Sequence, residues 1–153
     1  MRRCWSLFVV LFVGSLFGSV ARAAQIDFVV VVNASNPITS ISRDELAKIF
    51  LKQETTWPDG QAIAPVDQAA DSPVRGTFTR EILRRSVGAV KSYWEKQIFS
   101  GSAVPPVEKS SNDSVSSYVL TNRGAIGYIS ALVLDAGKAV VRLPAGVKVL
   151  RIE

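Results

Sequence analysis

A polar loop between a predicted strand and a predicted helix carries the side chains best suited to binding an anion. Residues 62–66 form a short apolar run, and Ser72-Pro73 is typical of a helix start, because serine is a common N-cap and proline is favoured at the first helical position. The loop would present a hydroxyl, free backbone N–H groups and the positive end of a helix dipole at the carboxyl end of the strand. Helix N-termini suit anions, so the segment predicts an oxyanion site, although capping alone also explains a Ser-Pro start.

The groups that could hold the anion come from two loops. The first offers Asp67, Gln68, Ser72, the backbone N–H groups of Val74 and Arg75, and the Arg75 side chain. The second follows the predicted strand 26–32 and offers Asn33 and Ser35, which are also ordinary turn residues. We expect the two loops to meet at one edge of a sheet, where open α/β folds place their ligands.

Arg75 and four further residues each raise a question of role. Arg75 either supplies positive charge to the site or points outward as a solvated side chain. Trp57 either lines the ligand or packs over a helix. Gly124 and Gly127 either let backbone approach a ligand or serve as a left-handed helix cap and a close strand–helix contact. Tyr128 is expected to pack with its hydroxyl reaching solvent.

Catalysis is a poor fit to the residue types present. The chain has no histidine, and its one cysteine, Cys4, precedes the N-terminal apolar run. The usual general bases and thiol nucleophiles are therefore missing, and the scattered carboxylates form no metal-binding pattern. The sequence predicts a binding protein with no cofactor or metal rather than an enzyme.

The first 23 residues have the features of a secretory signal peptide. Arg2 and Arg3 precede an apolar run over residues 5–20, and Ala-Arg-Ala at 21–23 matches the small-x-small cleavage pattern. The run is shorter than the ~20 apolar residues of a membrane-spanning helix. We therefore expect cleavage after residue 23, a periplasmic location in a bacterium, and no stable membrane insertion.

Residues 24–153 are expected to form a single domain. The chain has 18 Lys and Arg against 13 Asp and Glu, and removing Arg2, Arg3 and Arg22 leaves 15 against 13. This small net charge, without a basic block, does not favour nucleic-acid binding. The roughly 130 residues that remain are enough for one core and few for two.

Strand and helix signals alternate along this domain. Strands are predicted at 26–32, 62–66 and 125–129, helices from Ser42 (a capping box with Glu45), from Pro73, around 93–98 and after Asn112, and a hairpin-like strand pair at 139–143 and 147–152. This alternation indicates an α/β domain.

Four segments in order carry a family resemblance. They are Phe28 to Asn33, Ser42 to Trp57 with Lys-Ile-Phe-Leu-Lys at 48–52, Pro65 to Phe78, and Arg123 to Ile129 with its Gly-Ala-Ile-Gly-Tyr. Together they resemble the substrate-binding proteins of phosphate ABC importers, a branch of the type 2 periplasmic binding proteins, over residues 26–130. The resemblance implies one of two lobes that close over an oxyanion, built on a mixed, mostly parallel sheet with helices on both faces.

The loop departs from the pattern of that family. Typical members read Arg-x-Asp-x-Ser-Gly-Thr there, and these residues touch phosphate. Aligned on Ser72, this chain has Gln68 in place of the Arg, Ala70 in place of the Asp, and Pro-Val at 73–74 in place of Gly-Thr. A shifted loop would offer Asp67 or Asp71 as the acidic residue. Arg75 would replace the missing charge.

Two functions are consistent with these features. The first is a periplasmic module that binds phosphate or a related oxyanion for an ABC importer, with a permease, a second lobe or a second chain closing the cleft. The second is a non-transport interaction or sensing module with a vestigial ligand site. Binding in the first case is expected to be weak, because one lobe leaves half of the anion in water.

Overall fold

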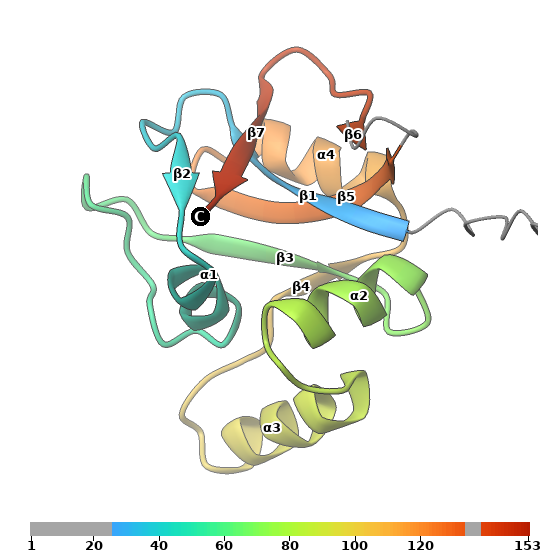
Figure 1. Ribbon diagram of the computed structural model, residues 1–153. Helices are drawn as coiled ribbons and strands as arrows, with labels where there is room; N and C mark the ends of the chain where they lie inside the picture. The colour runs from blue at the N-terminus through green and yellow to red at the C-terminus, as the bar shows by residue number, and fades with distance from the viewer. Residues whose placement is uncertain (1–25, 134–138) are drawn as a thin grey trace, which may run out of the picture.

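The computed structural model describes residues 26–133 and 139–153 (Figure 1). The elements are β1 (Ile26–Asn33), β2 (Ser40–Ile41), α1 (Arg43–Phe50), β3 (Ala64–Gln68), α2 (Pro73–Glu81), α3 (Val87–Phe99), β4 (Val107–Lys109), α4 (Asn112–Thr121), β5 (Ala125–Val133), β6 (Ala139–Val140) and β7 (Val147–Ile152). The predicted signal peptide and its cleavage site lie outside the described residues. Within those residues, no helix has the length and apolar character needed to cross a membrane.

The strands form one mixed sheet. Its order is β2-β7-β1-β5-β3-β4, and β6 pairs with β5. Strands β2, β3, β4, β5 and β7 run in one direction, whereas β1 and β6 run in the other. Helices α1 and α2 cover one face and α4 covers the other (Figure 1). The predicted α/β lobe, with a mostly parallel sheet between helices, is confirmed.

Alternation along the central strands sends side chains to both faces. Phe28, Val30 and Val32 of β1 pack with the helices α1 and α2, whereas Val31 packs with α4. All four are buried. The near-continuous apolar run of β1 is therefore explained by burial on both faces, as predicted.

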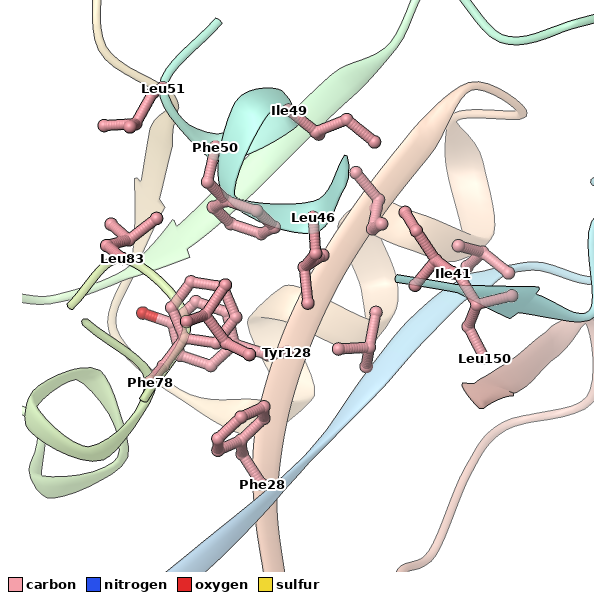
Figure 2. Packing of buried hydrophobic residues seen from close by; sticks show 14 of the residues in the cluster. Phe28, Ile41, Leu46, Ile49, Phe50, Leu51, Phe78, Leu83, Tyr128 and Leu150 are labelled. Atoms are coloured by element: carbon pink, nitrogen blue, oxygen red, sulfur yellow. The ribbon is translucent and has the colours of Figure 1, made fainter. Parts of the chain in front are cut away.

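Four aromatic rings fill the face beneath α1 and α2. The Phe78 ring of α2 stacks on the Tyr128 ring of β5, with centroids 3.8 Å apart and planes 3° from parallel. Phe28 and Phe50 surround this pair, and Figure 2 shows Phe50 reaching it from α1. The stack fixes where the Tyr128 hydroxyl points.

The predicted start of α1 is confirmed, and its sequence signal lies within a few residues. Ser42 makes the predicted capping box with Glu45 at the start of α1. The predicted hairpin at the C-terminal end is wrong, because β6 pairs with β5 and β7 pairs with β1 and β2. Joining β1 buries Val147 and Leu150 of β7 in the two cores, which a two-stranded hairpin alone would not achieve.

Candidate functional site

Residues from three strands and two helix starts converge at the carboxyl end of β3. After β3 ends at Gln68, a turn leads to α2, and the Ser72 N–H donates to the Ala69 carbonyl at 2.9 Å. Strand β4 is parallel to β3 and α4 follows it, so both helix N-termini lie at the same edge of the sheet. We call this group the β3 site; its members are Asp67, Gln68, Ser72, Arg75, Glu108, Asn112, Tyr128 and Ser130.

Arg75 is the charged centre of the β3 site. It is 4% exposed, and its Nη2 lies 3.0 Å from Asp67 Oδ2. Its Nη1 lies 3.2 Å from Glu108 Oε1 and also donates to the Gln68 carbonyl. The interpretation of Arg75 as an outward, solvated arginine is therefore wrong.

The position of Arg75 on α2 explains its burial. Arg75 shares the inner face of the helix with Phe78 and Thr79, three and four residues later, and both are buried. The Arg80 side chain, on the outer face, is exposed. The i, i+3, i+4 spacing was a signal for burial that the charge of Arg75 obscured.

Asp67 is a buried carboxylate with several donors. Besides Arg75, it accepts hydrogen bonds from the Tyr128 hydroxyl and from the Gln68 N–H at 2.9 Å. Burial nonetheless raises the pKa of Asp67 to about 6, against the lowering effect of these three donors.

Burial and the Asp67 charge also raise the pKa of Tyr128, which stays protonated as a donor. The predicted solvent contact of the Tyr128 hydroxyl is wrong, because this residue is completely buried.

Gln68 and Asn112 link β3 to the start of α4. Gln68 Nε2 donates to Asn112 Oδ1 at 2.9 Å and to the Tyr128 carbonyl at 3.2 Å. Asn112 in turn donates from Nδ2 to Ser130 Oγ at 2.6 Å and accepts from the Ser130 N–H at 3.1 Å. Because both amide hydrogens of Gln68 are used within the protein, this residue positions its neighbours rather than supplying a free donor.

Ser72 makes no capping bond, although it occupies the N-cap position of α2. Its hydroxyl instead donates one long hydrogen bond to Gln68 Oε1, at 3.5 Å. Pro73 has no N–H, and the Arg75 N–H donates to the Ser72 carbonyl at 3.0 Å. The expected donation from the Arg75 N–H is therefore already spent within the helix. The Val74 N–H, in the first turn, has no intrahelical acceptor.

Asn33 and Ser35 lie at the opposite end of the sheet from Ser72. Strand β1 is antiparallel to β5, and β5 is parallel to β3, so Asn33 lies beside the start of β3. The Asn33 amide donates to the carbonyls of Val119 and Leu120, both at 3.0 Å, and its Oδ1 accepts from Ser35. The prediction that the two loops meet is wrong, because the direction of β1 separates them.

Trp57 and Gly124 have packing roles. Trp57 is 4% exposed and its Nε1 donates to the Gly124 carbonyl at 3.0 Å, which agrees with the packing interpretation. Asn122 is the C-cap of α4, and Gly124 has no positive φ, so the predicted left-handed cap is wrong. A Cβ at Gly124 would lie 2.1 Å from the Ala62 carbonyl oxygen, so close backbone approach requires glycine there.

Gly127 makes the predicted close strand–helix contact. A Cβ on this residue would lie 2.7 Å from a methyl of Val66 and 2.8 Å from a methyl of Val115. Its small size lets α4 approach β5 closely. The start of α4 is thereby held near the β3 site.

Three members of the β3 site escaped the sequence reasoning: Glu108, Asn112 and Ser130. Across residues 26–133 and 139–153, no three His, Cys, Asp or Glu side chains gather to hold a metal. A cavity of about 90 Å³ lies between α1, β2 and the segment around Trp57, and no β3-site residue lines it. In the β3 site, Asp67, Gln68, Arg75 and Tyr128 are buried, whereas the Glu108 side chain is 55% exposed.

Comparisons with known proteins agree with this architecture. The family model for the PBP superfamily domain matches residues 21–150. An ABC-type phosphate transport receptor from Vibrio cholerae is 25% identical with a TM-score of 0.61, covering 84% of this chain and 47% of the receptor. Among curated proteins, no sequence matches significantly.

Two more distant structures share the fold. A phosphate ABC transporter substrate-binding protein from Clostridium perfringens, solved with bound phosphate, is 17% identical with a TM-score of 0.62, covering 84% of this chain and 46% of that one. PstS from Borrelia burgdorferi is 15% identical with a TM-score of 0.58, covering 84% and 48%. The chain thus spans about half the length of these solved relatives, and from its match over 130 of 153 residues it belongs to the family of PBP superfamily domains.

Proposed function

We propose that this chain is a non-enzymatic binding module for a small oxyanion, phosphate or a relative, in the periplasm. The observation that carries the proposal is the β3 site itself. The Ser72 hydroxyl, held by one long hydrogen bond to Gln68 Oε1, and the Val74 N–H stand at the start of α2, and Arg75 lies in the first turn of the same helix. Helix starts of this kind bind anions, and a protein of the same fold was solved with bound phosphate.

The partners follow from the half-length match. In this proposal an ABC importer permease receives the anion, and a second lobe or a second chain covers the part of the ligand that this lobe leaves in water. A helix dipole contributes about 0.3–1 kcal/mol, whereas a millimolar site already needs about −4 kcal/mol. The isolated lobe is therefore expected to bind weakly.

Calorimetry of the chain without its first 23 residues tests the proposal. Phosphate, sulfate, a phosphonate and molybdate are titrated separately at low salt. The expected result is millimolar binding of at least one anion, weakened by added salt because screening acts on an exposed charge. If none of the four binds or raises the melting temperature, the proposal is wrong and an interaction module remains.

A further inference from the structure

Two carboxylates share the single guanidinium of the β3 site. Asp67 and Glu108 are direct partners in the parallel pairing of β3 and β4, so their side chains leave the sheet on the same face. Like charges placed side by side on a sheet repel each other. Arg75 offsets this repulsion by contacting both, at 3.0 Å and 3.2 Å.

The two carboxylates differ in how firmly they are held. The Asp67 side chain is 5% exposed and has the Tyr128 hydroxyl and the Gln68 N–H as further donors. The Glu108 side chain is 55% exposed, and within the described residues its partner is Arg75 alone. Glu108 is therefore the member that can leave at little cost, since exposed ion pairs contribute about 0–1 kcal/mol.

Charge at the β3 site opposes an incoming anion while Glu108 stays. With both carboxylates ionised, one guanidinium faces two negative charges. Asp67 already neutralises Arg75, so Glu108 adds an uncompensated negative charge where the oxyanion would bind. The Arg75 Nε is buried and lacks an acceptor within the described residues, so the guanidinium retains unused donor capacity.

We propose that the Glu108 carboxylate is a built-in competitor for the oxyanion on Arg75. Glu108 contacts Arg75 Nη1. When the ligand binds, an oxyanion oxygen takes that place and the Glu108 side chain turns into solvent. The inference rests on the proposed oxyanion function and adds a residue that sets its affinity. Glu108 lowers the affinity for every anion, and most for those with the highest charge.

Glu108→Gln tests the inference, with Glu95→Gln as the matched control. Glu95 is also exposed, at 62% of its side chain, and has one ion pair, with Lys91 on α3. Both variants change the net charge equally, and only the first touches Arg75. Calorimetric titration with inorganic phosphate should show about three- to tenfold tighter binding by Glu108→Gln than by wild type, whereas Glu95→Gln should match wild type.

The possible results distinguish the role of Glu108 from the proposed oxyanion function. Phosphate binding by Glu108→Gln but not by wild type would support the competitor strongly. Equal affinities of wild type and Glu108→Gln, or equal gains in both variants, would overturn the role of Glu108 while the oxyanion function stands. Absence of binding in all three proteins would overturn the proposed function and, with it, this inference.

Discussion

The two ends of the sheet hold their polar side chains by different kinds of interaction. Beside the start of β3, Asn33 and Trp57 donate to backbone carbonyls, and both are neutral. At the carboxyl end of β3, the guanidinium of Arg75 forms ion pairs with the side chains of Asp67 and Glu108. Bonds to backbone fix the fold, whereas a charged cluster can exchange one partner for a ligand.

The two arrangements also differ in how much they contribute to stability. A buried ion pair is rarely the most stabilising choice, since apolar residues of similar volume often do as well or better. The buried pair of Asp67 and Arg75 is therefore not by itself an argument for stability, and it fits the proposed oxyanion site. The end with Asn33 needs no such explanation, because its amide satisfies the last carbonyls of α4.

The largest effect is expected from Arg75→Gln. The substitution leaves Asp67 buried without its counterion. We expect it to lower the free energy of unfolding by about 3–5 kcal/mol. Urea denaturation measures the loss, and Arg80→Gln, exposed on the same helix, should change stability by less than about 0.5 kcal/mol. Similar losses in the two variants would show that the buried pair contributes little.

Next in size is the pH dependence caused by Asp67. Its pKa is raised from 3.8 to about 6 in the folded protein, so the folded state binds this proton more tightly than the unfolded state does. The resulting stability is complete below about pH 4 and is lost as the pH rises through about 6, by about 3 kcal/mol at most.

Comparing wild type with Asp67→Asn isolates this contribution. The difference between their free energies of unfolding, measured in urea across this pH range, should shift against the wild type as the pH rises and level off above about pH 7. Parallel pH profiles for the two proteins would contradict the raised pKa.

A smaller effect is expected at the opposite end, from Asn33→Ala. The substitution removes two hydrogen bonds to the carbonyls of Val119 and Leu120 and should cost about 1–3 kcal/mol of unfolding free energy. The folded variant should bind phosphate as wild type does in calorimetry. Weaker binding without loss of stability would put Asn33 back in the site.

Sequence reasoning succeeded where the determinant was local. The Ser42 capping box, the apolar run of β1 and the Ser72-Pro73 helix start are each encoded within a few residues, and all three were predicted. The polar edge after β3 followed from the last of these. Local signals thus located the α2 side of the site.

The rest depends on pairing between distant segments. Nothing within 26–33 specifies that β1 runs antiparallel to β5, yet that direction removes Asn33 from the site. Likewise, the ion-pair partners of Arg75, Asp67 and Glu108, lie 8 and 33 residues away, and the three-residue β4 gives a weak pattern. The charge of Arg75 suggested solvent because its partners were not identifiable locally.

The smallest effects on stability, and the sharpest contrast, come from deleting one hydroxyl at each end of the sheet. Ser72→Ala removes no capping bond and should alter the free energy of unfolding by less than about 0.5 kcal/mol. Ser35→Ala removes the hydrogen bond that the exposed serine donates to Asn33 Oδ1 at 2.7 Å and should cost about 0.5–1.5 kcal/mol. Only Ser72→Ala should weaken phosphate binding, because its hydroxyl, held by one long hydrogen bond, is the donor that the proposal assigns to the anion. Calorimetry and urea denaturation on the same samples separate affinity from folding.

Ser42→Ala provides the stability reference, since that serine does cap α1 and its loss should cost about 1 kcal/mol. Equal phosphate affinities for Ser72→Ala and Ser35→Ala would remove the distinction between the two ends.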